Sequence, residues 1–594
     1  MGEIVGTSAP RETARGGALP RPVFVLALFT VLAVAMTWPL AAKAGHALIG
    51  TDTNALNDSY FGVWIFGWQA HQLLIDPLHL FSANIFYPFA NSLAFSEIIL
   101  PQALMYLPLA LAFNNPVLAY NLVVLATFPL NGLAMYLWAF DLQRGQDDGR
   151  IRTAAAILAA IVFTFCAYKL GEIRHVQLLA AQWMPLTLLF LKRGLERPTV
   201  RNAFLTALFF ALNALSSLYY AVFLAFAMVI YAAVDFAVRR YRLTRAQLAY
   251  GISAAVIAGV LIAPLLAPFL RLEAQYHFSG ARDPRLFAAR PVSYLASPGT
   301  NWLYGAATRP FYVAGKGQPL YPGLAAGLLA LLGTVELVRR SGSSRERAAG
   351  GRLSLVIVLF LWITAAASFV LSFGPQLIAG REVTPVTLIR MPYYWLSLVI
   401  TPLKGLNAPA RFAVLVMLGL AALTAFGAGW LFKRAGRGWP VAAVLAGAIL
   451  LLEYASFPLE LNTVSAASSM SPVYAFLAIQ PPGQPVVELP MGQPNFADQD
   501  RYVVYTYNSV YHWQPLVNGY STFIPPEYYA LVKDVQAFPS KASVTRLRDW
   551  GVIYLVVHSD RYKNASRLRA SLDALGGIDH VQDFGSIWLY RMRE

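Results

Sequence analysis

The sequence of 594 residues has little charge and almost no cysteine. Asp, Glu, Lys and Arg make up 13 % of it, whereas soluble proteins carry about 25 %, which excludes an ordinary water-soluble enzyme. The only cysteine, Cys166, excludes a disulfide framework and a cysteine-based metal site. The chain also lacks GxxxxGK[ST], HExxH, GxSxG and CxxC patterns, so nucleotide hydrolysis and thiol chemistry are not expected.

Long apolar runs are present instead, and hydrophobic residues make up 57 % of the chain. About 20 apolar residues span a bilayer as a helix. The pattern therefore predicts an all-α polytopic membrane protein with about 11 to 13 transmembrane helices. The apolar segments are 23–42, 98–112, 117–140, 153–168, 176–191, 203–217, 219–238, 247–270, 320–338, 353–373, 412–432 and 440–458.

The net charge of +16 comes from the connectors between these segments. Six short segments carry 22 Lys and Arg in 74 positions, and four others carry 13 in 149 positions. This density indicates membrane topology through the positive-inside rule rather than nucleic-acid binding. The basic, cytoplasmic set is 1–22, 141–152, 192–202, 239–246, 339–352 and 433–439, and the external set is 43–97, 169–175, 271–319 and 374–411.

All of the basic connectors lie on the same side of the membrane only if the short segment 98–112 does not cross it. It is flanked by Pro101 and by Asn114-Asn115-Pro116, which fits a re-entrant helix. This interpretation gives 11 crossings, and an additional hidden crossing would give 13. In both cases the N-terminus is cytoplasmic and the C-terminal segment is external.

Three parts follow from this topology. Residues 1–22 form a cytoplasmic tail, and residues 23–458 form the membrane domain with long external loops 43–97, 271–319 and 374–411. Residues 459–594 are nearly neutral and predict an extracytoplasmic α/β domain. Its expected strands are 486–489, 552–557 and 587–590, and its expected helices are 526–537 and 541–550.

The first external loop carries two carboxylates, Asp52 and Asp58, soon after the first membrane helix. Phe61, Trp64 and Trp68 follow at helical spacing, which predicts an aromatic helix in the membrane interface. Asp58 suits the N-cap of that helix. It is also the candidate general base, with Asp52 as the alternative, since a cap holds its carboxylate in place.

The short external turn between 153–168 and 176–191 contains Glu172, Arg174, His175 and Gln177. Four polar groups at the mouth of a bundle are more than a turn needs, so they are candidates for binding a donor phosphate or substrate. Glu172 and His175 are three residues apart and would share a helix face. Together with Asp58 they are a candidate metal site, and a purely structural turn is equally compatible with the pattern.

Two arginines flank the third long external loop. Arg390 and Arg411 can each hold a lipid phosphate through a bidentate guanidinium. The alternative is an arginine that extends to the membrane surface. In the terminal segment, 501–529 contains nine aromatic residues; these suit sugar stacking, but packing of the terminal domain on the membrane domain is favoured.

The architecture resembles the GT-C superfamily of integral-membrane glycosyltransferases, which share a cytoplasmic N-terminus, an acidic first external loop and a many-helix bundle. Within it, the chain is similar to largely uncharacterised bacterial GT-C-like membrane proteins. The similar stretches are 84–88 (Asn-Ile-Phe-Tyr-Pro), Ser96-Glu97, 216–220 (Ser-Ser-Leu-Tyr-Tyr) and 488–490 (Glu-Leu-Pro). The first loop lacks the tight Asp-x-Asp or Asp-Glu pair of other members.

The resemblance implies transfer of a sugar from a polyprenyl-phosphate donor to an envelope acceptor at the external face of the bacterial inner membrane. Asp58 or Asp52 would match the acidic position of the first loop. A divalent cation, Mg²⁺ or Mn²⁺, would be a cofactor. A membrane lipid and a lipid-linked sugar would be the partners, with no nucleic acid. The competing interpretations are a lipid or polysaccharide transporter and a non-catalytic envelope-assembly protein.

Overall fold

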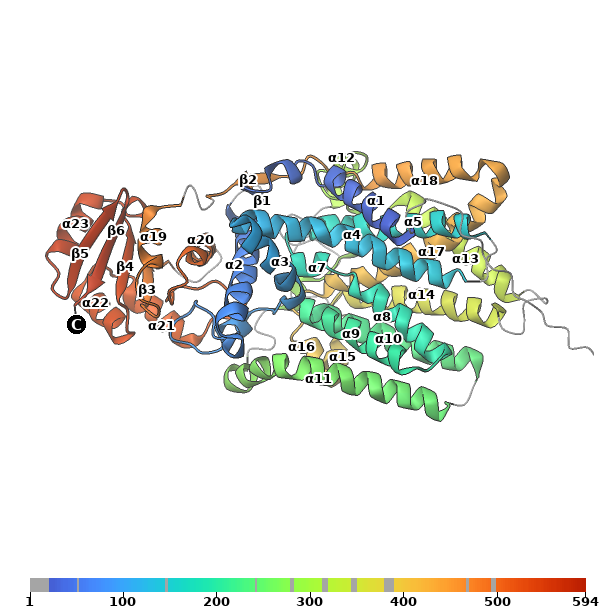
Figure 1. Cartoon of the computed structure of the whole chain (residues 1–594), viewed down its shortest axis with the longest axis horizontal. Helices are drawn as coiled ribbons and strands as arrows, with labels where there is room; N and C mark the ends of the chain where they lie inside the picture. The colour runs from blue at the N-terminus through green and yellow to red at the C-terminus, as the bar shows by residue number, and fades with distance from the viewer. Residues whose placement is uncertain are drawn as a thin grey trace, which may run out of the picture.

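A helical bundle and a small terminal domain make up the computed structural model. Figure 1 shows the small domain at one end of the bundle and helix α2 (Thr53–Ile75) lying across that end, between the two. The predicted fold class, a polytopic helical membrane protein with a terminal α/β domain, is confirmed. The structure describes residues 21–50, 53–144, 148–240, 243–277, 283–311, 319–342, 350–378, 389–465, 470–492 and 498–593.

The bundle helices occupy the predicted apolar segments. The longer ones are α1 (Arg21–Met36), α3 (Leu100–Phe113), α4 (Pro116–Leu142), α5 (Gly149–Phe165), α8 (Trp183–Glu196), α9 (Val200–Ser216), α10 (Leu218–Arg239), α11 (Arg245–Tyr276), α13 (Leu324–Gly342), α14 (Gly350–Ser372), α17 (Ala413–Arg434) and α18 (Trp439–Tyr454). Short helices lie between them: α6 (Ala167–Gly171), α7 (Val176–Leu179), α12 (Gly305–Thr308), α15 (Pro392–Val399) and α16 (Thr401–Lys404).

Within the described residues, seven helices are long and apolar enough to cross a membrane. They include α4, α10, α11, α14, α17, α18 and the continuous pair α5 and α6, while α1, α3 and α9 are shorter apolar helices. Helix α3 lies beside α2, at the end of the bundle next to the small domain (Figure 1). The number of crossings, 11 in the topology derived above, stays a prediction.

Two glycines bring α13 and α17 into backbone contact. A Cβ atom on Gly333 would collide with the carbonyl oxygen of Leu423, and one on Gly427 would collide with that of Leu329. Small residues at a crossing allow close approach of membrane helices, where packing rather than hydrophobic burial drives association. This pair of helices therefore depends on glycine at both positions.

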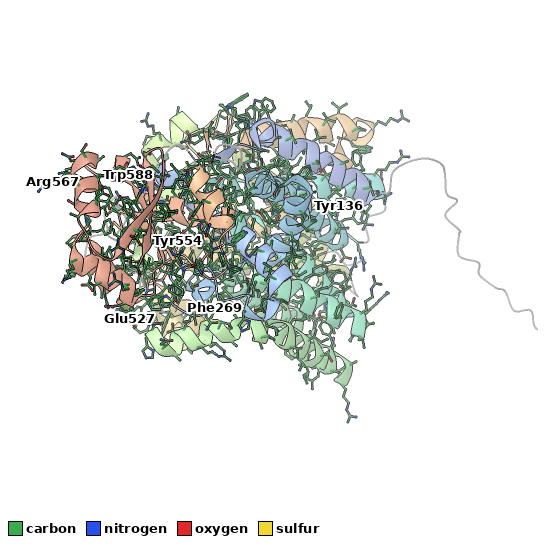
Figure 2. All side chains as sticks on the ribbon, turned by 60° about the vertical axis from the view of Figure 1, so that its left-hand side comes forward. Tyr136, Phe269, Glu527, Tyr554, Arg567 and Trp588 are labelled. Carbon is green, nitrogen blue, oxygen red and sulfur yellow. The ribbon has the colours of Figure 1, made fainter. Side chains whose placement is uncertain are left out.

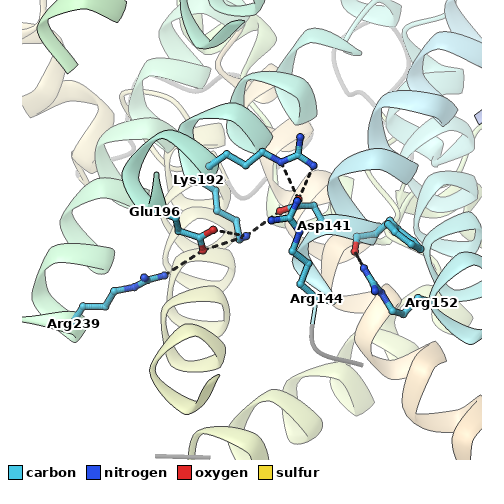
Figure 3. A network of polar contacts seen from close by, with 8 residues as sticks. Asp141, Arg144, Arg152, Lys192, Glu196 and Arg239 are labelled. Carbon is cyan, nitrogen blue, oxygen red and sulfur yellow. Dashed lines mark hydrogen bonds and ion pairs between the residues drawn. The ribbon is translucent and has the colours of Figure 1, made fainter. Parts of the chain in front are cut away.

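Ion pairs join the helix ends that lie farthest from the small domain. Asp141 of α4 accepts hydrogen bonds from Lys192 Nζ (2.9 Å) and Arg193 Nη2 (2.7 Å) of α8. Glu196 of α8 pairs with Arg239 of α10 at 3.6 Å. Figure 3 shows these side chains as one connected network. The side chains of Asp141 and Lys192 are each 1 % exposed, so the network is a buried joint between three helices.

The basic connectors gather at this end of the bundle. The network links the starts of 141–152, 192–202 and 239–246, and Arg352 Nη1 donates to the carbonyl oxygen of Arg239 at 3.5 Å. Figure 1 places the turn between α17 and α18 at the same end, opposite the small domain. The structure thus separates the basic connectors from the small domain, as the charge density predicts. The side of the cell membrane that each end faces stays a prediction.

The small domain contains a four-stranded sheet in the order β3-β4-β6-β5. Strands β3 and β4 are parallel, with Val486 opposite Tyr554, and the other neighbours are antiparallel. The predicted strands and helices of this domain are confirmed. Its elements are α19 (Pro472–Ala478), β3 (Val486–Leu489), α20 (Gln499–Asn508), α21 (Pro526–Val535), α22 (Lys541–Asp549), β4 (Tyr554–His558), α23 (Ala565–Asp573), β5 (Ile578–Phe584) and β6 (Ile587–Met592).

The small domain is joined to the first loop by a two-stranded sheet and by aromatic contacts. Strand β1 (Ala47–Ile49) pairs antiparallel with β2 (Leu461–Thr463). Trp513 stacks on His71 of α2 with ring centroids 4.4 Å apart, and Tyr520 meets Phe61 at 5.4 Å. Three of the aromatic residues of 501–529, Tyr507, Trp513 and Tyr520, therefore pack the domain onto α2. Figure 2 shows the side chains between the sheet, marked by Tyr554 and Trp588, and the bundle, marked by Tyr136.

Candidate active site

Asp58 lies within the second turn of α2, and its side chain is 39 % exposed. The prediction that Asp58 is the N-cap of a helix starting near Phe61 is wrong, because α2 already begins at Thr53. The position of Asp58 is therefore fixed by helical backbone on both sides. Asp52, the alternative carboxylate, lies outside the described residues.

The aromatic face of α2 is not in contact with lipid, which corrects the predicted interfacial helix. Trp64 is 0 % exposed and Trp68 is 5 % exposed. Trp64 Nε1 donates to Asn84 Oδ1 (3.0 Å), and Trp68 Nε1 donates to the Leu80 carbonyl oxygen (2.9 Å). The rest of the first loop and the small domain cover α2, so these aromatic residues hold the helix between them.

The turn that carries Glu172 and His175 is held in place by hydrogen bonds from side chains to the carbonyl groups that follow it. The predicted segment 176–191 is divided here, since α7 ends at Leu179 and α8 begins at Trp183. Lys169 Nζ donates to the carbonyl oxygens of Leu178 (2.6 Å) and Leu179 (3.1 Å).

Two further side chains bind the same carbonyl groups. Tyr220 Oη donates to the Leu178 carbonyl oxygen at 2.7 Å, and Asn131 Nδ2 donates to that of Leu179 at 2.7 Å. A break in a helix inside a membrane bundle leaves carbonyl groups that need donors. These donors fix the turn where it meets α2.

His175 lies between two carboxylates. Its Nε2 is 3.1 Å from Asp58 Oδ2, and its Nδ1 is 2.6 Å from Glu172 Oε2. The Glu172 side chain is 1 % exposed and the His175 side chain is 24 % exposed. The predicted Glu172–His175 pair is thus present, and the fold brings Asp58 to the free side of the imidazole.

Charge determines the protonation of this triad. Burial opposes the charged form of His175, but Asp58 and Glu172 outweigh it and raise the pKa of His175 to about 10. Burial likewise opposes ionisation of Asp58, and the charges of His175, Arg174 and Arg411 lower the pKa of that carboxyl to about 2. The pKa of Glu172 is also lowered, by His175 and Arg411 against burial. At neutral pH the triad is an imidazolium between two carboxylates.

Arg411, in the short helix η7 (Pro409–Phe412), lies near enough to the triad for its charge to lower the pKa of both Asp58 and Glu172. Its guanidinium lies over the Tyr219 ring, 4.6 Å from the ring centroid, and its buried Nε has no hydrogen-bond partner in the described part of the chain. Tyr219 Oη accepts from the Asn407 backbone N–H at 3.0 Å. Arg411 is thus a cation held at the site with donor capacity to spare.

The other predicted basic and polar residues are not all close to Asp58. Arg174 lies near enough to Asp58 for its charge to lower the pKa of that carboxyl. Arg390 is exposed and stacks on Tyr394, 4.5 Å from the ring centroid. Gln177 is partly buried on α7. The structure therefore brings Arg174 and Arg411 to Asp58, and the described contacts of Arg390 lie within its own loop.

Glu97 is a site residue that sequence reasoning missed. Both of its carboxylate oxygens are buried and have no hydrogen-bond partner within the described residues. Burial raises the pKa of Glu97 to about 7, although the positive charges of Arg411 and His175 act to lower it. A count of acids would have found it, because the loop 43–97 contains only Asp52, Asp58, Asp76 and Glu97.

The predicted metal site does not have the geometry of a metal centre. Among the residues that the structure describes, no three His, Cys, Asp or Glu side chains are placed to hold a metal ion. The His175 ring occupies the space between Asp58 and Glu172, and both of its nitrogens face carboxylates. A protonated imidazole has no lone pair for a metal. The three residues fit an ion-paired triad and not a ligand set.

Comparison with known proteins gives structural neighbours only. No protein-family model and no curated protein matches the sequence. ArnT from Cupriavidus metallidurans bound to undecaprenyl phosphate is similar over 95 % of this chain and 97 % of its own, with 14 % identity and a TM-score of 0.45. An oligosaccharyltransferase from Archaeoglobus fulgidus, tethered with an acceptor peptide, is similar over 96 % of this chain and 74 % of its own. Its identity is 11 % and its TM-score is 0.43.

These neighbours are GT-C membrane glycosyltransferases. A second structure from Archaeoglobus fulgidus, the oligosaccharyltransferase AglB with an inhibitory peptide and a dolichol-phosphate, has 13 % identity and a TM-score of 0.38. It covers 96 % of this chain and 74 % of its own. At such identities and scores, the function of this chain has to be argued from its own residues.

Proposed function

We propose that this protein is a membrane glycosyltransferase that moves a sugar from a polyprenyl-phosphate donor to an envelope acceptor, with inversion at the anomeric carbon. The observation that carries the proposal is the convergence of Asp58, His175, Glu172 and Arg411 at one end of the bundle. They come from α2, the 172–175 turn and η7, which are far apart in the sequence. Sugar transfer from a lipid phosphate needs a base and a cation for the leaving phosphate, and we assign these roles to Asp58 and Arg411.

Asp58 is the base in the proposed reaction. The acceptor hydroxyl oxygen bonds to the anomeric carbon while the bond from that carbon to the donor phosphate oxygen breaks. The bonding electron pair leaves with the phosphate, and the hydroxyl proton passes to Asp58. His175 holds the carboxylate through the 3.1 Å ion pair, so the geometry is set before the substrates bind.

Arg411, with Arg174 beside it, binds the donor phosphate in this proposal. A guanidinium matches phosphate oxygens with paired donors, and Arg411 Nε is unpartnered in the described chain. A bound phosphate also offsets the positive charge that holds the pKa of Asp58 at about 2. Donor binding therefore raises that pKa and makes Asp58 a stronger base when it is needed.

Glu97 supplies a second carboxylate. Its two oxygens lie buried without partners in the described residues. An unsatisfied buried carboxylate destabilises the fold, so its presence here favours a role in binding a ligand. In the proposed reaction it accepts a hydrogen bond from a hydroxyl of the transferred sugar or of the acceptor. Its pKa of about 7 gives it both protonation states near neutral pH.

The reaction takes place on the external face of a bacterial cytoplasmic membrane in this proposal. The site lies at the end of the bundle next to the small domain, and the basic connectors lie at the other end (Figure 1). Basic connectors are retained in the cytoplasm. The N-terminus is then cytoplasmic and the small domain periplasmic.

The test is transfer by purified protein in liposomes of bacterial phospholipid. A panel of undecaprenyl-phosphate-linked radiolabelled sugars is offered with an envelope extract as acceptor, and undecaprenyl phosphate binding is measured separately. We expect Asp58→Asn to lower transfer by about 10²- to 10⁴-fold with the donors that the parent uses, and to leave lipid binding intact. Asp76→Asn is the matched control, since Asp76 is an exposed acid of the same loop that pairs with His79.

Two outcomes would overturn the proposal. Full transfer by Asp58→Asn and by Asp52→Asn would exclude both predicted bases. The absence of transfer with every donor, together with movement of undecaprenyl-phosphate lipid across the bilayer, would establish a transporter.

A further inference from the structure

Helix α20 of the small domain packs along the segment of α2 that carries Asp58. Asn57 Nδ2 donates to Asp500 Oδ1 at 3.1 Å, although the two residues are 443 positions apart. Three residues further along α2, Tyr60 contacts Tyr507 of α20 with ring centroids 4.8 Å apart. The small domain thus contacts the residue directly before the proposed base.

The direction of the Asn57–Asp500 hydrogen bond is fixed by chemistry. An ionised carboxylate only accepts, so the amide nitrogen of Asn57 must face it. Asp500 lies in the first turn of α20, where the helix dipole favours a negative charge. Asn57 is 6 % exposed, so its amide has little water to replace a lost acceptor. A hydrogen bond to a charged group is about twice as strong as a neutral one.

Both neighbours of Asp58 are therefore held, and by different parts of the chain. Ser59 Oγ donates to the carbonyl oxygen of Ile49 in the first loop at 2.9 Å. Successive side chains on a helix are about 100° apart, so Asn57, Asp58 and Ser59 point in three directions. The bonds on either side fix the rotation of α2 about its axis, and that rotation aims the Asp58 carboxylate at His175.

We propose that Asp500 is a positioning residue of the active site, through which the small domain sets the direction of the Asp58 carboxylate. The inference rests on the proposed function, in which Asp58 is the base. The small domain is then part of the catalytic apparatus and more than a cover over the external end of the bundle. Asp500 acts through Asn57 and does not touch the reacting atoms.

The test compares Asp500→Ala and Asp500→Asn in the full-length protein, using the undecaprenyl-phosphate-linked sugar that the parent transfers. A displacement of about 1 Å at a reacting group costs up to about 100-fold, so we expect Asp500→Ala to lower kcat by about 10- to 100-fold. We expect KM for the donor and binding of undecaprenyl phosphate alone to stay at parental values. Asp500→Asn keeps an acceptor oxygen and should recover most of the loss.

A double-mutant cycle and a matched control complete the test. The losses in Asn57→Ala and Asp500→Ala should not add, because both remove the same bond. Asp534→Ala removes another surface carboxylate of the small domain, one that pairs with Arg546, and should leave kcat unchanged. An unchanged kcat in Asp500→Ala, or additive losses in the cycle, would overturn the inference, whereas full transfer by both Asp58→Asn and Asp52→Asn would overturn the proposed function instead.

Discussion

The two ends of the helical bundle contain similar side chains and differ in how those side chains are paired. At the connector end, both oxygens of Asp141 are bound, one by Lys192 and the other by Arg193 and Arg144 (Figure 3). At the end next to the small domain, both oxygens of Glu97 lack partners in the described chain. The carboxylate at the connector end thus has a cation on each oxygen, whereas the carboxylate at the site can still accept hydrogen bonds.

The contrast separates structural charge from functional charge. A buried charge is tolerated when its partners are complete, and leaving one partner out costs several kcal/mol. The Asp141 network meets that condition and joins three helices. The unmatched donors and acceptors around Asp58 are instead suited to a charged ligand, which completes the set when it binds. The same residue types therefore give a joint at one end and a binding site at the other.

The largest expected difference between the ends is the side of the membrane that each faces. A reporter that is active only in the periplasm should be active when fused after residue 594 and inactive when fused at residue 345, in the basic connector 339–352. The physical reason is the threefold difference in basic density between the two sets of connectors. The reverse pattern would overturn the orientation and the external position of the active site.

The next difference concerns catalysis. We expect Asp58→Asn to lower transfer per folded molecule by about 10²- to 10⁴-fold, the usual contribution of a general base. Asp141→Asn should leave transfer per folded molecule close to the parental value. Initial rates in proteoliposomes, normalised to folded protein, check both variants. Equal losses in the two variants would remove the distinction between the ends.

Fold stability should depend on the charged residues at the connector end more than on those at the active site. Asp141→Asn leaves the buried Lys192 and the partly exposed Arg193 facing a neutral group, so we expect a loss of about 3 kcal/mol in unfolding free energy. Unfolding in detergent micelles, followed by circular dichroism, measures the change. Glu97→Gln, which removes an unpaired charge, should maintain or raise stability. A stable Asp141→Asn protein would show that the network is not a joint.

A smaller effect is expected for donor binding at the triad. His175→Ala removes the cation between Asp58 and Glu172 and leaves their two negative charges facing the donor phosphate. Glu172→Gln releases one end of the imidazole. We expect each variant to weaken undecaprenyl phosphate binding by about tenfold, the size of one charged hydrogen bond. Glu196→Gln at the connector end is the control, and parental affinity in both site variants would show that the turn is structural.

The smallest expected effect is a change in the pH profile. The pKa of Glu97 is raised from 4.5 to about 7, so its contribution to fold stability is complete below pH 4.5 and lost as the pH rises through about 7. If the carboxylate form binds substrate, transfer should rise through the same range. Initial rates from pH 5 to 9 should show this limb in the parent, and Glu97→Gln should lack it.

The triad itself cannot produce a limb near pH 7. The raised pKa of His175 makes its stabilisation complete below 6.5 and lost as the pH rises through about 10. The lowered pKa of Asp58 makes its stabilisation complete above 3.8 and lost as the pH falls through about 2. A limb near pH 7 that persists in Glu97→Gln would therefore point to a group outside this site.

Much of the fold could be predicted because periodicity and apolar length are local properties. The strands at 486–489 and 587–590 were identified from β-branched and aromatic runs, and β3 and β6 contain them. Strand β5 was missed because its residues 579–583 are exposed at the sheet edge and carry no apolar pattern. The start of α2 was also missed, since Thr53 and Asn54 give no stronger signal than Asp58 does.

The site could be predicted only in part. Sequence reasoning selected Asp58, Glu172, His175 and Arg411, because charged residues are rare beside apolar segments and therefore conspicuous. It could not assign Asp58 to His175, because contact across more than 100 positions depends on how α2 lies on the bundle. It placed the aromatic residues of α2 in the membrane interface, because a sequence does not reveal that the small domain covers that helix.

The sequence by itself determined the helical membrane class, the division between basic and neutral connectors, and the α/β character of residues 459–594. These follow from composition and from spacing over a few turns of chain, where the solvent or the bilayer acts on each segment separately. Only the tertiary structure decided which charges are paired and which atoms, at Glu97 and at Arg411 Nε, have no hydrogen-bond partner among the described residues. Pairing depends on distances of about 3 Å between elements that are far apart in the chain, and only the packed fold sets those distances.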